Sequence, residues 1–323
     1  MPKSHALDTT HSSHLETVDR TESCPVSVVI PTFNGRQLLE QNLPAVLAAM
    51  RAQDELVIVD DASQDDTVEW LSNQFQLETN LKNHDQSGSF SLVSGSWSCS
   101  VNKEKRGRLR LIANQNNLRF AASCNRGVEQ AQHQLVLLLN NDVSPTACTI
   151  EYLLPHFSDE TTFAVGCLEI EPNLDNAVGG KNKLWFEKGL FHHSRADEFS
   201  SGETAWASGG SAMFDREKWL ALSGFDLDFY PAYWEDIDLS YRARRKYHWQ
   251  VWFDAKAKVY HNHQSTHQTV LGSSKIQQIS WKNADKFTWK NGTFWQKFSF
   301  LLWRPYWWWQ RSKLTTQDKQ LIE

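Results

Sequence analysis

The chain has 323 residues, of which 33 are Lys or Arg and 38 are Asp or Glu, so its formal net charge is −5. This mild negative charge argues against a general nucleic-acid-binding protein, which needs a basic surface to neutralise phosphates. Hydrophobic residues make up 40% of the chain, as in an ordinary globular domain, and no run approaches the roughly 20 apolar residues of a membrane-spanning helix.

The cysteines and the amino-terminal residues indicate a compartment. The five cysteines are spread along the chain without a CxxC pair, which argues against a disulfide scaffold or a zinc cluster and favours a reducing environment. The first residues contain no apolar core of a signal peptide. We therefore expect a cytoplasmic protein.

The first predicted strand and helix follow a polar tail. Residues 1–24 are rich in His, Ser and Thr and lack aromatic side chains, so we expect a disordered tail that buries too little apolar surface to fold. Residues 26–30 form an apolar, β-branched run that predicts a buried parallel strand. Apolar side chains then recur at three- and four-residue steps between residues 39 and 50, which predicts a helix with an irregularity at Pro44.

The alternation of strand and helix continues. Residues 56–59 predict a second buried strand, and a helix over about residues 68–75 follows, with Asp65 or Asp66 as its cap. Residues 82–107 are rich in Ser and Gly, and we expect them to form a flexible surface insertion.

Beyond this insertion, a strand at residues 109–113, a helix at about residues 121–132 and a strand at residues 135–139 are predicted. Such alternation implies an α/β fold, in which helices cover both faces of a parallel sheet. Ligands of such folds bind at the carboxyl ends of the strands.

Polar residues cluster at these predicted strand ends. The first strand leads into Pro31, Thr32 and Asn34, and the second ends at Asp60 and Asp61. The two acids could accept hydrogen bonds from a nucleoside base or ribose, or they could cap the next helix. The sequence contains neither GxGxxG after the first strand nor GxxxxGK[ST] anywhere, which argues against a Rossmann dehydrogenase and a P-loop NTPase.

A second candidate is Asp142, which follows five consecutive apolar residues, Asn140 and Asn141. A strand-end carboxylate flanked by amide oxygens suits a hard cation such as Mg²⁺ or Mn²⁺, which completes its shell with water and substrate phosphates. The alternative interpretation is an Asx-turn that ends the strand.

Three further groups lie later in the chain. Glu235 and Asp236 open a predicted helix, where the macrodipole favours acids whether or not they have a chemical role. The Gly-rich stretch at Gly210 could allow a ligand to approach the backbone closely. His261 and His263 end a β-like segment, and such a pair either binds metal or has a structural role.

Taken in order, these motifs resemble the inverting glycosyltransferases of family 2, which have the GT-A fold. The resemblance is carried by the segments VSVVIPTFNG, ELVIVDDASQDDT, NNLRFAASCNRGVEQAQHQLVLLLNNDV, ASGGSAMFDREKWLALSGFDLDFYPAYWEDIDLSYRARR and KVYHNHQST. It covers about residues 25–265 and is similar in style to rhamnosyltransferase-like enzymes of cell-surface polysaccharide assembly. It implies a GT-A domain with a mostly parallel central sheet flanked by helices.

The resemblance implies roles for individual residues. Asp236 of the x-E-D motif, beside Glu235, would be the catalytic base. Asp142 and His261 would hold a divalent metal, Mn²⁺ or Mg²⁺, with His263 as the alternative ligand. The chain departs from the family's D-x-D by having Asn140 at the first position. Asp61 would pair with the nucleobase, and Asp60 would orient its loop. The residues expected at the nucleotide-sugar are Pro31, Thr32, Asn34, Asp60, Asp61, Asn117, Phe120, Asn125, Asn141 and Gly210.

The implied reaction moves a sugar from a nucleotide-diphospho-sugar, linked to UDP, dTDP or GDP, to a hydroxyl of a glycan or lipid-linked acceptor. Two other classes stay open. One is a catalytically silent nucleotide-sugar-binding subunit of an assembly. The other is a nucleotidyltransferase, which would need a Gly-rich, basic loop after the first strand, where the sequence has only Gly35 and Arg36.

The last part of the chain, residues 266–323, is expected to form a helical, aromatic-rich extension. Of the 15 tryptophans, 7 fall in the final 43 residues. Aromatic side chains beside Lys and Arg over residues 295–311 fit peripheral contact with the cytoplasmic face of a membrane, since indole rings prefer the headgroup boundary. The alternative is that these rings pack on the catalytic domain or on a partner chain.

Overall fold

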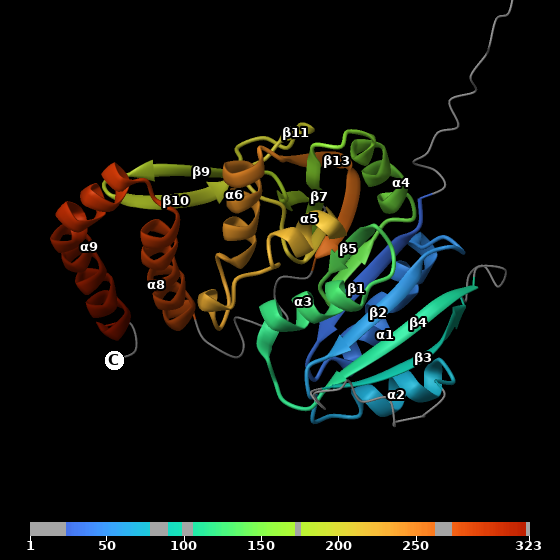
Figure 1. Cartoon of the computed structure of the whole chain (residues 1–323). Helices are drawn as coiled ribbons and strands as arrows, with labels where there is room; N and C mark the ends of the chain where they lie inside the picture. The colour runs from blue at the N-terminus through green and yellow to red at the C-terminus, as the bar shows by residue number, and fades with distance from the viewer. Residues whose placement is uncertain (1–23, 78–89, 99–105, 172–175, 262–272, 321–323) are drawn as a thin grey trace, which may run out of the picture.

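The computed structural model describes residues 24–77, 90–98, 106–171, 176–261 and 273–320 (Figure 1). The strands are β1 (Val26–Thr32), β2 (Glu55–Asp60), β3 (Phe90–Ser98), β4 (Arg106–Asn114), β5 (Leu135–Leu139), β6 (Val143–Pro145), β7 (Thr162–Glu171), β8 (Asn176–Gly179), β9 (Asn182–Glu187), β10 (Leu190–Arg195), β11 (Gly202–Glu203), β12 (Ser211–Asp215) and β13 (Gln250–His261). The α-helices are α1 (Arg36–Ala49), α2 (Thr67–Gln74), α3 (Arg119–Gln130), α4 (Thr149–Leu153), α5 (Arg216–Ala221), α6 (Glu235–Tyr247), α8 (Ser273–Asn291) and α9 (Phe294–Gln320). Short 3₁₀ helices cover Leu154–Ser158 and Leu227–Phe229.

One large sheet organises the fold, with the strand order β11-β13-β7-β12-β5-β1-β2-β4-β3. Parallel pairing joins β5, β1, β2 and β4 at its centre and also joins β7 to β13, whereas β12 is antiparallel to both of its neighbours. The chain leaves β1 toward β2 on one side and returns to β5 on the other. A crevice for ligands is expected at such a switch point.

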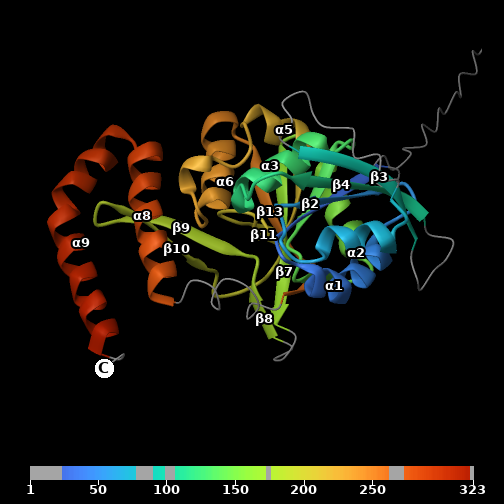
Figure 2. The ribbon, with the colours of Figure 1, turned by 90° about the horizontal axis from the view of Figure 1, so that it is seen from below.

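The sheet has two core layers because alternate side chains of each strand point to opposite faces. On one face, Val28 and Ile30 pack with residues of α1, α2 and α4. On the other, Val29 packs with residues of α3, α5 and α6. Figure 2 shows α1 and α2 on one side of the sheet and α3, α5 and α6 on the other. The predicted α/β class is therefore confirmed.

The predicted central elements are also confirmed: the strands expected at residues 26–30, 56–59, 109–113 and 135–139 lie within β1, β2, β4 and β5. Helix α1 continues through Pro44. The expected insertion over residues 82–107 is wrong for Phe90–Ser98, which forms β3 and pairs along its whole length with β4. Pairing with β4, which is itself held in the sheet by β2, outweighs the weak strand propensity of this Ser-rich segment.

A third core lies beyond the sheet, where α8 and α9 join the β9–β10 hairpin and α6. It combines Phe191 of the hairpin, Trp234 before α6, Phe287 of α8 and Phe300 of α9. The predicted helical, aromatic-rich extension is confirmed, and Figure 1 shows α8 between α9 and the rest of the molecule. Helix α8 therefore shares a core with the segment that leads into α6. The tail over residues 1–23 and the start of the extension lie outside the described residues.

This shared core predicts a large stability effect at Phe287. Its side chain is 0% exposed and lies in edge contact with Phe191 and Tyr241. Phe287→Ala should lower the free energy of unfolding by about 3–5 kcal/mol through lost burial and a cavity, measured by urea denaturation. Trp289→Ala on the same helix is the control, because Trp289 is 52% exposed. Equal effects of the two substitutions would contradict the shared core.

Candidate active site

The carboxyl ends of β1, β2 and β5 meet at one edge of the sheet, and hydrogen bonds join them. The carbonyl of Thr32 accepts from the backbone N–H of Asp61 at 2.8 Å, and the Thr32 hydroxyl accepts from the Asn141 amide at 2.9 Å. A Cβ at Gly35 would lie 2.1 Å from the Thr32 hydroxyl oxygen and 2.5 Å from the Asn141 amide nitrogen. Only glycine therefore lets α1 begin so close to this junction.

The two acids at the end of β2 have different surroundings. The Asp61 carboxylate accepts from the Asn114 amide and the Leu118 N–H through Oδ1, and from the Arg119 N–H through Oδ2. It thereby fixes the start of α3. Asp60 accepts from the Ser63 N–H, but its Oδ1 is buried without a hydrogen-bond partner in the described part of the chain. Burial, helped by Asp65 and Asp61, raises the pKa of Asp60.

These contacts favour a different division of roles from the predicted one. Asp61 is occupied with the loop before α3, whereas Asp60 keeps an acceptor atom for a ligand.

Asn34 has a backbone φ of 48° and connects the turn after β1 to the turn after β2, because its N–H donates to Ser63 and its side chain accepts from the Gln64 N–H. Pro31 lies in β1 opposite Val59.

Asp142 and His261 lie side by side, as predicted for a metal pair. The Oδ1 atom of Asp142 is 3.3 Å from Nε2 of His261. The other ring nitrogen, Nδ1, lies 3.8 Å from the carboxylate of Glu169 on β7, which accepts a 2.6 Å hydrogen bond from Ser211. His263, the predicted alternative ligand, lies outside the described residues.

The two acids control the charge of this histidine. Burial alone would lower the pKa of His261, but Asp142 and Glu169 on either side of the ring raise it to about 9. The ring is therefore positively charged at neutral pH when no cation is present. Glu169 was not predicted, although a lone acid within the apolar run of residues 163–170 is a signal that could have found it.

Two glycines lie between Asn140, at the end of β5, and the start of α6. The carbonyl of Gly210 accepts from the Asn140 N–H at 2.9 Å, and a Cβ at Gly210 would lie 2.4 Å from the Asn140 amide nitrogen. The N–H of Gly209 points at Oδ2 of Asp236 at 3.4 Å. The Gly-rich stretch thus has Asn140 on one side and Asp236 on the other.

Glu235 and Asp236 are adjacent acids, of which Glu235 is buried and Asp236 is partly buried. Burial raises the pKa of both, and the neighbouring Asp236 raises that of Glu235 further. The N–H groups of Ile237 and Gly209 act in the opposite direction on Asp236. Oε2 of Glu235 has no hydrogen-bond partner among the described residues. Glu235 therefore has the higher pKa of the two and is protonated more readily, whereas Asp236 stays ionised more easily.

The segment before this pair is strained and held from several sides. Tyr233 and Trp234 have φ values of 73° and 82°, a left-handed conformation that is costly for side chains of this size. The Asn283 amide of α8, which is 1% exposed, donates to the carbonyls of Phe229, Ala232 and Tyr233, each at 3.0 Å. Helix α8 therefore fixes the backbone that presents Glu235 and Asp236.

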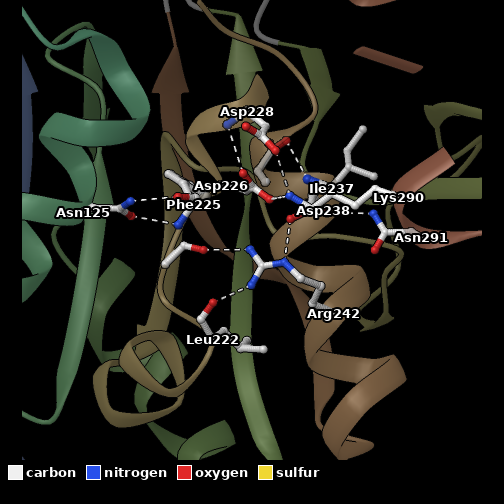
Figure 3. Close-up of polar contacts among 12 residues, drawn as sticks. Asn125, Leu222, Phe225, Asp226, Asp228, Ile237, Asp238, Arg242, Lys290 and Asn291 are labelled. Atoms are coloured by element: carbon white, nitrogen blue, oxygen red, sulfur yellow. Dashed lines mark hydrogen bonds and ion pairs between the residues drawn. The ribbon is translucent and has the colours of Figure 1, made fainter. Parts of the chain in front are cut away.

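Figure 3 shows two further sets of interactions that hold the segment between α5 and α6. Arg242 of α6 donates to the carbonyls of Leu222 and Gly224 while it pairs with Asp238 at 2.6 Å. Lys290 of α8 forms ion pairs with Asp226 and Asp228. Charged side chains of α6 and α8 thus anchor the first part of the segment that connects α5 to α6.

Three residues predicted at the nucleotide-sugar have other contacts. Both amide atoms of Asn125 are used by the backbone N–H and carbonyl of Phe225, each at 2.8 Å. This bond holds the loop before α6, so the interpretation of Asn125 as a donor ligand is not supported. Asn117 accepts from the Arg119 N–H. Phe120 stacks on Phe225 at 6.0 Å and lies beside Gly209, within the site region.

A comparison of the sequence with family models gives one match. Residues 27–88 and 99–219 match the family described as glycosyl transferase family 2, which is more than half of the chain. The matched segments contain the ends of β1, β2 and β5 and the Gly-rich stretch, and they end before α6. No curated protein matches the sequence.

Solved structures share the fold at low sequence identity. A mannosyltransferase from Pyrobaculum calidifontis with GDP-Man and Mn²⁺ is 15% identical, with a TM-score of 0.53 over 92% of this chain and 79% of the other. S. aureus TarS 1-349 is 12% identical, with a TM-score of 0.52 over 86% and 70%. GalNAc-T7 with UDP, GalNAc and Mn²⁺ is 16% identical, with a TM-score of 0.52 over 74% of this chain and 44% of that one. The chain thus spans less than half of the GalNAc-T7 structure.

The contacts of Asn283 predict that α8 is needed for an ordered site. Asn283→Leu keeps a similar volume but leaves three carbonyls without their donor, so the free energy of unfolding should fall by about 1–3 kcal/mol, measured by urea denaturation. Any transfer activity should fall more than donor binding, because the loop presents Glu235 and Asp236. Ser280→Ala, which removes a single 3.3 Å bond to Trp234, is the control. Unchanged stability in Asn283→Leu would exclude this anchoring role.

Proposed function

This chain belongs to glycosyltransferase family 2, and we propose that it transfers a sugar from a nucleotide-diphospho-sugar to a hydroxyl acceptor with inversion at the anomeric carbon. The observation that carries the proposal is the arrangement around Gly209 and Gly210. A partly buried acid with a raised pKa, Asp236, lies on one side. The strand-end residues that follow β5 lie on the other. In this arrangement a base lies on one side of Gly209 and Gly210, and residues that would stabilise the leaving diphosphate lie on the other.

The residues at the end of β5 fit a divalent cation. Two atoms about 3 Å apart correspond to neighbouring ligands in an octahedral shell with bonds near 2.1 Å, and Oδ1 of Asp142 is 3.3 Å from Nε2 of His261. Glu169 on the far side of the ring would orient the imidazole, as carboxylates do for metal-bound histidines. No group of three or more His, Cys, Asp or Glu side chains in the described residues is arranged to hold an ion.

A two-ligand site of this kind leaves positions for water and for phosphate oxygens, as Mg²⁺ and Mn²⁺ prefer. We therefore assign Asp142 and His261 to a divalent ion. When bound, the ion would stabilise negative charge on the leaving diphosphate as a Lewis acid. The Mn²⁺ in the GalNAc-T7 and mannosyltransferase structures supports this assignment.

The chain's own residues account for the proton. The acceptor oxygen forms a bond to the anomeric carbon while the bond from that carbon to the diphosphate breaks, with its electron pair passing to the diphosphate. Asp236 would take the proton of the acceptor hydroxyl, a general-base role. Glu235, protonated more readily because of burial and of the charge on Asp236, would limit the negative charge beside the base. One displacement of this kind inverts the anomeric centre.

The nucleotide is proposed to lie over the ends of β1 and β2. Asp60 offers a buried acceptor atom for the base or ribose, and Thr32, Asn34 and Asn141 form the adjoining polar surface. The bound nucleotides of the neighbours, UDP and GDP-Man, support a UDP-, dTDP- or GDP-linked donor. Which sugar and base are selected depends on the rest of this surface.

The acceptor is proposed to be a glycan or a lipid-linked glycan in the assembly of a cell-surface polysaccharide or glycolipid.

A cytoplasmic location is supported by the cysteines, because those in the described ranges, Cys24, Cys124, Cys148 and Cys167, are all free thiols. Free thiols are typical of a reducing compartment.

The proposal is tested by offering UDP-, dTDP- and GDP-sugars with Mn²⁺, with Mg²⁺ and with EDTA, and by measuring donor hydrolysis and transfer. We expect turnover of one donor that is lost in EDTA. Asp236→Asn should reduce kcat by about 10²–10⁴-fold, because the positioned base is removed, while the donor Kd stays unchanged. Asp159→Asn, which changes an exposed acid outside the site, is the control.

The outcomes separate the alternatives. Metal-dependent donor binding without hydrolysis or transfer to any acceptor would indicate a catalytically silent subunit. Release of pyrophosphate from a nucleoside triphosphate and a sugar phosphate would indicate a nucleotidyltransferase. A folded protein that binds no donor would contradict the proposal.

The raised pKa of Asp236 predicts the pH dependence of the reaction. The base must be ionised, so kcat/KM should rise with pH through its pKa and reach a plateau above it. Because burial raises this pKa, the acidic limb should lie well above the value of about 3.9 of an exposed aspartate. The measurement is a pH profile of kcat/KM at saturating metal. A plateau that extends down to about pH 4 would exclude Asp236 as the titrating base.

A further inference from the structure

Helix α9 presents two different apolar faces. On the inner face, Phe300 belongs to the core shared with α8 and the hairpin, and the Trp307 indole donates to the carbonyl of Lys188 at 2.7 Å. A Cβ at Gly189 would lie 2.7 Å from the Ser299 carbonyl oxygen, so the hairpin turn touches the helix backbone. Arg311 pairs with Asp285 of α8 through both carboxylate oxygens. The helix is therefore firmly docked on its inner side.

The outer face carries large apolar side chains that are widely exposed. Their exposed fractions lie between 48% and 75%. Their spacing of three, four and seven residues places them along one side of the helix. We call this set the outer stripe; it consists of Phe294, Trp295, Phe298, Leu301, Leu302, Trp308 and Trp309. It extends over about 22 Å of helix, and Figures 1 and 2 show α9 at the end of the molecule away from the sheet.

The charges beside the outer stripe all have one sign. Residues 286–316 contain no Asp or Glu. Lys297 and Arg304 lie seven residues apart, and each lies three or four residues from members of the stripe, so these two side chains form a basic edge along it. An apolar stripe with a basic edge is the pattern of a helix that lies in the interface of a membrane with anionic lipids.

We propose that the outer stripe of α9 docks this protein on the surface of a bilayer that contains anionic lipids. The helix would lie in the plane of the headgroups, with the indole rings at the boundary between headgroups and acyl chains and with Lys297 and Arg304 beside lipid phosphates. No helix in the described part of the chain is long and apolar enough to cross a membrane, so the contact is peripheral. The inference goes beyond the proposed function and does not depend on it.

A second copy of the chain fits the outer stripe less well. Pairing two α9 helices through this stripe would bring two basic edges together, and the segment has no acid that could pair with either. Like charges held close in this way oppose association. A lipid surface supplies both missing components, an apolar layer for the stripe and phosphates for its edge. Residues 295–311 were expected to contact a membrane, but two of them, Phe300 and Trp307, face the body of the protein instead.

The test is co-sedimentation of the full chain with vesicles of phosphatidylcholine and phosphatidylglycerol, and with vesicles of phosphatidylcholine alone. We expect binding to the anionic vesicles that added salt weakens. Replacing Trp295 and Trp308 with Ser should weaken partitioning by at least about tenfold, because two buried rings are lost. The matched control is Trp185→Ser on β9, which is 42% exposed but lies outside the stripe, and it should bind as the unmodified chain does.

A second variant tests the basic edge separately. Lys297→Gln with Arg304→Gln should weaken binding to anionic vesicles by about fivefold per residue and leave binding to phosphatidylcholine unchanged. Circular dichroism checks that each variant is folded. Absence of binding to either vesicle, or equal binding by the Trp295 and Trp308 double variant, would overturn the proposal. So would a dimer in light scattering that this double variant abolishes, because the stripe would then be an interface between copies.

Discussion

The pair of carboxyl groups at the start of α6 is the constraint on which the rest of the site depends. Placing the buried Glu235 beside the partly buried Asp236 is costly, because burial and mutual repulsion both oppose their ionisation. The fold offsets part of this cost with the N-terminus of α6 and with the N–H groups of Gly209 and Ile237, which point at Asp236. It also needs a loop whose last two residues are left-handed, and such a backbone persists only where its surroundings fix it.

Part of this support comes from outside the residues that match the family. Helix α8 supplies the Asn283 amide, the Ser280 hydroxyl and the Lys290 ammonium to this loop. Asn125 of α3, expected to contact the donor, instead holds the loop from the other side. The helical extension is therefore part of the machinery that orders the acids. A catalytic body limited to residues 25–265 would present Asp236 on a loop that has lost the ties from α8.

The residues that could be predicted are those whose signal is local. Unbroken apolar runs identified β1, β2 and β5, and the polar residues that follow them identified Asp60 and Asp142. The pairing of β3 with β4 could not be predicted from its Ser-rich sequence, because the stabilisation comes from a neighbouring strand. The same holds for Asp61 and Asn125. Asp61 accepts from the Asn114 side chain and from two backbone N–H groups, all of which lie 53–58 residues away in the chain, and Asn125 bonds to the backbone of a residue 100 positions away. A motif shows which residue type is present, but its hydrogen-bond partners depend on the tertiary structure.

The β9–β10 hairpin connects α9, the proposed membrane-binding helix, with the segment that precedes Glu235. Its turn at Gly189 touches α9, and His193, about 13 Å further along the strand, packs in edge contact with Trp206 and Trp234. Trp234 immediately precedes Glu235. If α9 lies on a lipid surface, these packed contacts connect that surface to the segment that presents the two acids.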